Sequence, residues 1–464
     1  MASMDLVMAA LSHDEGDLEM WIEKLADMVA RQQESLEVVS TREKVATRVD
    51  CAIKMMVAAH AGKKFNAEAT TKLLSTCKMF ERFLCLARIA PSIPSNWSVN
   101  EEALKCMVNS VYSRPDFVTQ HFVPKAYLSR LLDLAKLPGP ASFHLLIWKC
   151  VLVSCEAPCV IESLCGSLEA WQLLCTKVGW FWSPTHLAGV VDFSKTLYFS
   201  FHGDHLFGVA VATDRSSLVL DLLKLIAVLV NEMKWTKEAE DAQPKLYMII
   251  HKLGELLLSI LRTTHPKISR LNSTLLDIKN KVLEVFIFIP LWLLAAFIER
   301  EQQREEEAEV LKTKEPITPD PLMIPVLPAL LQHLQTMLLA TRVEKTRQFS
   351  EILPTLIVCH NLTQIAKPDV KAFFKKSIFP NPTEVGILPE AKSSQALLAT
   401  ASAGHNHHSF FFKHLTFFLT CLDTNVKRYT GEWLYLLCDQ NADEYTKRTG
   451  LGNAIGMLRI KGLA

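Results

Sequence analysis

Apolar side chains recur at helical spacing wherever this sequence has a strong pattern. Such spacing places them on one face of an α-helix, whereas a half-buried strand would alternate every second residue. The pattern therefore predicts helices that each bury one face against a neighbour. The two clearest stripes are Leu73, Leu74, Cys77, Phe80 and Leu84, and Leu327, Leu330, Leu331, Leu334 and Leu338.

Composition agrees with an all-helical fold. Of the 464 residues, 49% are hydrophobic and 21% are charged, a balance that supports a large core and excludes a disordered chain. The 16 glycines are few for this length, because average usage is about 7%. A β-sandwich, with its many tight turns, would need more glycine. We therefore predict the all-α class.

A longer repeat links the helices. Its pattern is an apolar helix with an asparagine near its end, a proline soon after, and a second segment that closes on an aromatic residue and another proline. Degenerate repeats of about 40 residues are typical of armadillo and HEAT proteins, so we predict a right-handed superhelical solenoid. The copies are residues 103–124, 356–380 and, without the proline, 222–231, whose asparagines are Asn109, Asn361 and Asn231.

We expect residues 1–464 to form one armadillo-like domain, because apolar helices resume after each interruption. Irregular insertions are predicted near 178–208, 312–328 and 381–408, where aromatic, proline-rich or polar residues break the helical pattern. The first of these leaves β-structure open as an alternative. The charged run 299–309 is predicted to extend a helix into solvent.

The apolar run Val285–Ile298 is the segment most easily mistaken for a membrane span. It has fourteen residues and contains Pro290, whereas crossing the hydrocarbon takes about 20 residues. A fully buried helix pair, bent or broken near the proline, explains it better, and we expect no membrane span. The acidic start Met1-Ala2-Ser3-Met4-Asp5 lacks the features of a signal peptide, so we expect a reducing, cytoplasmic location.

Charge and cysteine content point to local recognition rather than to a cofactor. The net charge of +1 provides no overall field toward nucleic acid, so no nucleic-acid partner is expected. No cysteine pair has the C-x-x-C spacing of many zinc sites. We expect the crowded cysteines to be small buried apolar residues. They are Cys150, Cys155, Cys159, Cys165 and Cys175.

Gly450, Gly452 and Gly456 form G-x-G-x-x-x-G, one residue longer than the dinucleotide-binding fingerprint. That fingerprint follows a strand, whereas residues 432–449 have a helical pattern. A tight turn between helices explains the glycines better. The sequence also has no Walker A, G-x-S-x-G or H-E-x-x-H motif. We therefore expect no cofactor and no catalytic residues, and favour a protein that acts by binding.

Two histidine groups contain metal-binding residue types, yet we expect no metal site. We expect the first group in a surface loop and the second in an ordinary turn. The alternative is an enzyme hidden in the 178–208 insertion, where the second group would have to meet a further acid. The first group is His405, His407, His408 and His414, and the second is His202, Asp204 and His205.

Several polar residues are candidates for binding a partner. In an armadillo repeat the last helix lines a concave groove, where asparagine and basic side chains hydrogen-bond a peptide. For each candidate the alternative is an ordinary solvated charge or a helix-ending asparagine. The candidates are Asn109, Arg347, Lys371, Lys375, Lys427 and Arg428.

The C-terminal segment resembles the closing repeat of the synembryn family, the cytosolic chaperones and nucleotide-exchange factors of heterotrimeric G-protein α subunits. The resemblance rests on residues 423–428 (DTNVKR), 432–438 (EWLYLLC) and 450–454 (GLGNA). Weaker similarity extends through residues 102–109 and 347–380.

The resemblance implies a concave groove that grips the C-terminal helix of a Gα subunit, promotes GDP release and holds the nucleotide-free subunit. Asn109 and Arg347 fall on family positions that bind this helix, and Arg82 is a weaker match. We expect a monomer, recruited to the cell cortex or plasma membrane through Gα. The alternative is a generic armadillo adaptor without exchange activity, which a strongly acidic groove would favour.

Family members continue beyond the last repeat into an acidic, phosphorylatable segment and a further helix. This sequence stops at Ala464. We therefore expect either a truncated sequence or a lineage that keeps tail binding and chaperoning but exchanges nucleotide weakly.

Overall fold

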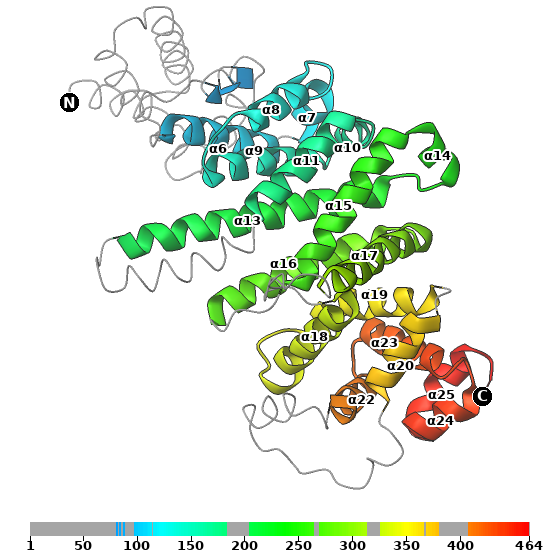
Figure 1. Cartoon of the computed structure of the whole chain (residues 1–464). Coiled ribbons are helices and arrows are strands. Elements are labelled where there is room, and N and C mark those ends of the chain that lie inside the picture. The colour runs from blue at the N-terminus through cyan, green and yellow to red at the C-terminus, as the bar shows by residue number, and fades with distance from the viewer. Residues whose placement is uncertain are drawn as a thin grey trace, which may run out of the picture. The chain divides into compact units, whose positions relative to one another are not determined.

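The computed structural model describes residues 80–81, 83–84, 87–88, 97–113, 115–182, 204–263, 269–312, 325–365, 368–379 and 407–463. These residues are helical apart from short turns, and no β-strand occurs among them. The predicted all-α class is therefore confirmed. The chain divides into two compact units, Met1–Met233 and Lys234–Ala464 (Figure 1).

The described helices of the first unit are built around α9, which packs against α6, α8 and α13. Trp148 of α9 and Trp171 of α11 are fully buried in its core. The helices are α6 (Ser98–Ser113), α7 (Pro115–His121), α8 (Tyr127–Lys136), α9 (Ala141–Ser154), α10 (Pro158–Cys165), α11 (Leu168–Phe181) and α13 (Asp204–Glu232).

The second unit contains longer helix pairs, among which α19 packs against α16 and α23. Two short turns of other helix types, η1 (Leu339–Val343, a π-helix) and η2 (Phe349–Ile352, a 3-10 helix), connect α18 to α19. The α-helices are α14 (Lys237–Ala242), α15 (Pro244–Arg262), α16 (Ser269–Phe288), α17 (Leu291–Lys312), α18 (Val326–Leu338), α19 (Leu353–Gln364), α20 (Pro368–Ile378), α22 (His407–Phe418), α23 (Thr424–Leu437), α24 (Ala442–Thr449) and α25 (Leu451–Ile460).

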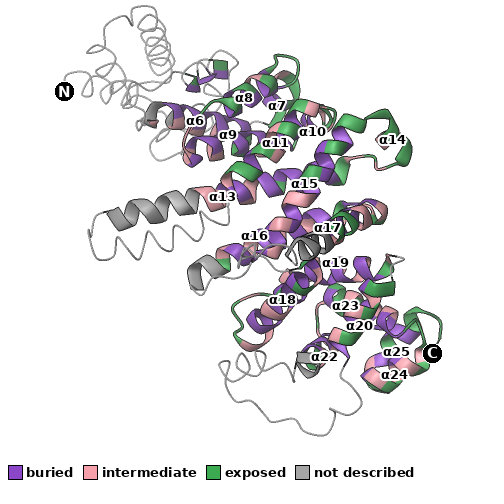
Figure 2. Ribbon diagram, viewed as in Figure 1, coloured by how far each residue is buried: buried purple, intermediate pink, exposed green. Residues whose placement is uncertain are grey.

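Most of these helices bury one face and expose another, as the apolar stripes predict (Figure 2). The asparagine and proline repeats also mark helix boundaries. Asn109 lies near the end of α6 and Pro115 begins α7, while Asn361 lies near the end of α19 and Pro368 begins α20. A proline suits the first helical position because its missing N–H would have had no partner there.

The apolar run around Pro290 forms two helices, as predicted, but they are not fully buried there, because Phe288 is 40% and Leu291 is 38% exposed. Helix α16 ends at Phe288 and α17 begins at Leu291. The Pro290 carbonyl accepts the amides of Leu293 and Leu294, each at 3.0 Å, and so opens α17. Within the described ranges no single helix is long and apolar enough to cross a membrane. Helices α9 and α10 together reach the length and composition of a membrane span, but the pair is bent by 117° at the break between them.

The C-terminal segment consists of three short helices with local stop signals. Asp423 Oδ1 accepts the amides of Asn425 and Val426 at the start of α23, each at 3.0 Å. Residues 432–449, whose pattern is helical throughout, are divided between α23 and α24. Gly450 has φ 84° between α24 and α25, a conformation that favours glycine. The predicted tight turn between helices is confirmed at Gly450, whereas Gly452 and Gly456 lie within α25 and not in the turn.

The cores of the predicted insertions, residues 183–203, 313–324 and 380–406, lie outside the described residues. At their edges, Val178–Phe181 end α11 and residues 326–328 open α18. The charged run 299–309 is helical as predicted, but it is not wholly solvated. Glu301 is buried and pairs with Arg262 of α15.

Candidate functional site

Polar and aromatic side chains of α19 and α23 meet where these two helices pack together. The His360 and Tyr429 rings lie 6.1 Å apart, and the Arg428 guanidinium lies 4.8 Å from the centre of the Tyr429 ring. His360 also contacts the side chains of Asn361 and Gln364, with 3.4 Å between polar atoms in each pair. We call these five residues the α19–α23 strip.

The strip offers hydrogen-bonding groups on a partly exposed surface. Arg428 and Gln364 are exposed, and His360, Asn361 and Tyr429 are half-buried. A guanidinium and two amides supply many N–H donors, and the aromatic ring adds apolar contact. Lys427, the residue before Arg428, is also exposed. The structure thus places two predicted partner residues, Lys427 and Arg428, on α23, which packs against the helix that carries Asn361.

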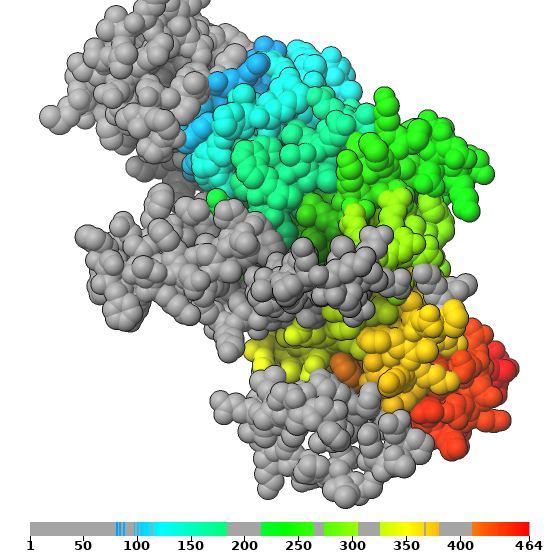
Figure 3. All heavy atoms as spheres, viewed as in Figure 1, coloured from blue at the N-terminus to red at the C-terminus, as the bar shows by residue number. Residues whose placement is uncertain are grey.

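Lys371 and Lys375 lie one turn apart on α20 and are brought together by one carboxylate. Their ammonium groups lie 2.7 Å and 2.5 Å from the two oxygens of Asp439, which follows α23. Hydrogen bonds from Lys371 and Lys375 lower the pKa of Asp439. Two cations and one anion leave a positive charge where α20 contacts α23. On the face drawn in Figure 3, the yellow atoms of this part of the chain adjoin the red atoms of the C-terminal helices.

Arg347 is held by neighbouring side chains. Its guanidinium lies 2.6 Å from Asp277 of α16 and 2.8 Å from Glu351 of η2, and it donates to the Ser273 hydroxyl and carbonyl at 3.2 Å. The Arg347 side chain is only 12% exposed. Because its two carboxylate partners belong to different helices, Arg347 connects η2 to α16. Two carboxylates around one guanidinium also give this cluster a net negative charge.

Replacing Arg347 by alanine is expected to destabilise the protein by about 1–2 kcal/mol, because Asp277 and Glu351 lose a partly buried, charge-assisted partner. Urea unfolding followed by circular dichroism measures this loss. Arg459→Ala is the matched control, because Arg459 is exposed on α25 and should change stability by less than about 0.5 kcal/mol. Equal midpoints for the two variants would contradict a structural role for Arg347.

The remaining predicted partner residues belong to the first unit. Asn109 is half-buried on α6, and Tyr112, one turn further along, is 71% exposed. Arg82 lies outside the described residues. Because Asn109 belongs to a different compact unit from Arg347, Lys371, Lys375, Lys427 and Arg428, the structure does not place it relative to them.

Sequence reasoning missed Tyr112, His360, Gln364 and Tyr429. A signal was present for three of them, because Tyr112 follows Asn109 by one helical turn and His360 and Gln364 flank Asn361 on α19. Tyr429 joins the strip only through the packing of α23 on α19. No local sequence pattern predicts the contact between Tyr429 and His360.

The histidine predictions need correction. His407 and His408 begin α22, and His414 is buried within it, so these residues are not in a surface loop. Asp204 and His205 begin α13 rather than forming a turn, because the helix starts earlier than the apolar pattern indicates. His202 and His405 lie outside the described residues. In the part of the chain that is described, no three metal-binding side chains gather.

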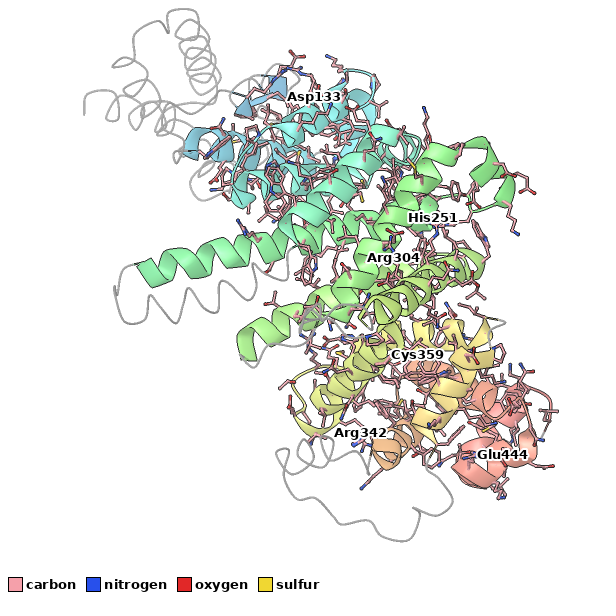
Figure 4. The ribbon with its side chains drawn as sticks, in the orientation of Figure 1. Asp133, His251, Arg304, Arg342, Cys359 and Glu444 are labelled. Atoms are coloured by element: carbon pink, nitrogen blue, oxygen red, sulfur yellow. The ribbon has the colours of Figure 1, made fainter. Side chains whose placement is uncertain are left out.

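The crowded cysteines are partly as predicted. Cys150 and Cys155 are buried, while Cys159, Cys165 and Cys175 are half-buried. Burial raises the pKa of the Cys155 thiol to about 12 and that of Cys165 to about 11, which keeps both protonated. Cys359 of α19 is fully buried in the second unit (Figure 4). Thiols in such surroundings are unreactive.

Comparison with known proteins gives these surfaces a context. The family model described as guanine nucleotide exchange factor synembryn (Ric8) matches residues 208–464, more than half of the chain. Chaperone Ric-8A of Macaca fascicularis is 29% identical over 126 residues, which cover 27% of this chain and 21% of that protein.

Two other relatives agree. Chaperone Ric-8B of Rattus norvegicus is 25% identical over 131 residues, which cover 28% of this chain and 22% of that protein. Chaperone Ric-8A of Xenopus laevis is 44% identical over 45 residues, or 10% of this chain and 8% of that protein. The aligned stretches thus span at most about a fifth of these relatives. On the family match across residues 208–464, this chain belongs to the synembryn (Ric8) family of guanine nucleotide exchange factors.

Proposed function

We propose that this protein binds the α subunit of a heterotrimeric G protein and acts as its exchange factor and folding chaperone. The observation that carries the proposal is the family match over residues 208–464, a range that includes the α19–α23 strip. Two sets of relatives bear the names chaperone Ric-8A and chaperone Ric-8B, which supports the chaperone role.

The proposed ligand is the C-terminal helix of Gα. The last turn of any helix has up to four carbonyls without intrahelical partners, and a chain terminus adds a carboxylate. Arg428, Asn361 and Gln364 carry N–H donors that suit these acceptors, while Tyr429 suits an apolar side chain. In this proposal Asn109 and Tyr112 of α6, and Arg82, contact other parts of the same ligand.

The proposed architecture is one armadillo-type solenoid over residues 1–464 whose concave face holds this helix. Helix repeats in such folds offer extended binding surfaces. Lys427 and the Lys371–Lys375 pair would add positive charge beside the strip, and Arg347 would hold the α16–η2 segment in shape. We propose a cytoplasmic monomer that reaches the cell cortex through Gα.

The mechanism needs binding and no catalytic residue. Withdrawing the terminal helix from the Gα core would loosen the nucleotide site and release GDP. The protein shifts Gα toward this open state only as far as it binds the open state more tightly than the closed one. A chaperone role follows from the same preference, because the nucleotide-free subunit is held until GTP binds.

One observation favours a second candidate, an adaptor for a different peptide. Asp277 and Glu351 outnumber the single charge of Arg347, so that part of the second unit suits a basic ligand. In this alternative the protein binds a basic segment without affecting nucleotide exchange.

The test is GDP release from purified Gα, with and without this protein, alongside a Gα that lacks its C-terminal residues. We expect acceleration that disappears with the tail deletion. Arg428→Ala and Asn361→Ala should each weaken binding to intact Gα about five- to twentyfold, the range for lost hydrogen bonds to charged or carbonyl acceptors. Arg459→Ala should leave binding unchanged.

Two other results of this experiment would contradict part or all of the proposal. Tail-dependent binding without faster GDP release would leave a chaperone and remove the exchange activity from the proposal. Failure to bind Gα at all, together with binding of a basic peptide, would favour the adaptor.

A further inference from the structure

Arg342 lies where η1 meets α22, and hydrogen bonds and packing fix its position. It lies in the π-helical turn Leu339–Val343, a type of turn that is often found at functional sites. The turn is fixed by the Ala340 carbonyl, which accepts the Thr346 amide at 2.9 Å and the Thr346 hydroxyl at 3.3 Å. These hydrogen bonds hold the backbone that carries the Arg342 side chain.

Two groups of α22 hold the guanidinium itself. It lies 3.6 Å from the centre of the Phe417 ring, and one of its nitrogens lies 3.2 Å from His414 Nδ1. Figure 4 shows Arg342 on the side of the second unit where α22 lies. Burial, followed by the charges of Arg342 and Lys413, lowers the pKa of His414 to about 4. His414 is therefore neutral near pH 7 and its Nδ1 accepts from Arg342.

Arg342 has no carboxylate partner among the described residues. The other half-buried arginines of the described second unit each have one: Arg262 pairs with Glu301, Arg347 with Asp277, and Arg448 with Glu444. A half-buried guanidinium without a counter-ion is unfavourable, because burial penalises charge. Burial accordingly lowers the pKa of Arg342, though arginine remains charged near neutral pH.

The surroundings increase the positive charge instead of neutralising it. Lys413 is exposed one turn before Phe417 on α22 and acts on the same His414 ring as Arg342. Glu344, two residues after Arg342, forms no ion pair with it. Phe417 is 41% exposed beside the guanidinium that it covers on one face. Apart from the contact with His414 Nδ1, no described residue accepts a hydrogen bond from the guanidinium, which leaves most of its five N–H donors for a ligand.

We propose that Arg342, Lys413 and Phe417 form a site for a carboxylate on an acidic segment of a partner protein. A planar fork stacked on an aromatic ring binds a carboxylate through two parallel N–H donors. Lys413 supplies a second charge for a neighbouring acid, and the exposed edge of Phe417 contacts the aliphatic part of the same side chain. This combination suits a peptide better than an isolated ion, which would leave Phe417 unused.

The site is independent of the proposed function, because none of its residues belongs to the α19–α23 strip. A negative result in the Gα experiment would not contradict this site. A negative result at this site would likewise not contradict the proposed binding of Gα.

The test is the fluorescence anisotropy of fluorescein-labelled hexaglutamate titrated with the full chain at about 50 mM salt, where surface charges are weakly screened. Wild type should bind saturably, and fluorescein-labelled hexaglutamine should not bind. Arg342→Gln should weaken hexaglutamate binding about ten- to a hundredfold, because it removes a charge-assisted pair of donors. Arg342→Lys keeps the charge but should still weaken binding about fivefold or more, since it loses the fork.

Two further variants test whether weaker binding could come from altered folding or from the loss of overall charge. Lys413→Gln, on the exposed surface of α22, should weaken binding about two- to fivefold without changing thermal unfolding. Arg459→Gln removes an equal charge from α25 and should change binding by less than about twofold.

Absence of saturable hexaglutamate binding would overturn the site. So would equal weakening by Arg342→Gln and Arg459→Gln, which would mean attraction to overall charge. Vesicles of phosphatidylserine and phosphatidylcholine provide the last arm. Loss of vesicle binding in Arg342→Gln with unchanged hexaglutamate binding would assign the guanidinium to a lipid headgroup and refute the peptide.

Discussion

Trp433→Ala is expected to destabilise the second unit by about 3–5 kcal/mol, the range for truncating a buried aromatic residue. Trp433 lies on α23 and is fully buried. Its indole Nε1 donates to Thr363 Oγ1 of α19 at 2.9 Å, and its ring lies 5.6 Å from that of Phe374 on α20. One side chain thus joins three helices, and alanine would leave a cavity at their junction.

Amide hydrogen exchange of α19 and α23 and urea unfolding of the full chain would measure this loss. Trp433→Phe is the graded control, since it keeps the ring contact but removes the hydrogen bond, and should cost about 1–2 kcal/mol. Trp180→Ala controls for tryptophan loss at a site that is 56% exposed. If Trp433→Ala unfolded at the wild-type urea midpoint and kept its exchange protection, the packing at this junction would not hold the helices together.

The result matters for how the C-terminal resemblance is understood. Residues 432–438 are part of the segment that most resembles the synembryn family, yet Trp433, Leu434 and Leu437 are buried. This part of the resemblance therefore reports core packing of α23 on α19 and α20. The side chains of the same helix that are available to a partner, Lys427 and Arg428, lie near its other end.

Lys279 should make stability increase with pH above neutrality. This lysine of α16 is completely buried, and its Nζ donates to the Thr263 carbonyl at the end of α15 at 2.6 Å. Burial lowers the pKa of Lys279 from 10.5 to about 7. Between these two values the unfolded chain holds a proton that the folded chain has lost. Raising the pH therefore favours the folded state, by up to about 1.4 kcal/mol per pH unit.

The measurement is the free energy of urea unfolding at pH 7.5 and 9.0, compared between wild type and Lys279→Met. The difference between the two proteins should change by about 2 kcal/mol over this interval, with wild type gaining. The comparison is needed because buried thiols act in the opposite direction. The raised pKa of Cys438, about 11, means that the unfolded state loses that proton first as the pH rises. Cys438 is present in both proteins, so its contribution cancels.

A pH-independent difference would show that the ammonium stays charged in the folded state. The Thr263 carbonyl and the negative end of the α15 dipole favour that charge, in opposition to burial. The experiment thus decides which of the two effects is larger at this position.

The sequence by itself determined the all-α class and most helix boundaries, because these depend on neighbouring residues. Apolar side chains at helical spacing set the buried faces, and single residues such as Asp423, Pro290 and Gly450 begin, separate or end helices through local backbone geometry. The turn at Gly450 and the break at Pro290 could both be predicted for this reason. Histidines at the edges of helices could not, since α13 and α22 begin before their apolar patterns do.

Only the tertiary structure decided which candidate charges are neutralised. Arg347 meets Ser273 across 74 residues, Lys375 meets Asp439 across 64, and Arg342 meets His414 across 72. In the sequence these basic residues look alike. Among the residues that the structure describes, Arg347 is enclosed by two carboxylates, Lys375 shares one with Lys371, and Arg342 has none. A basic residue's availability to a partner depends on its counter-ions, and packing of distant helices selects them.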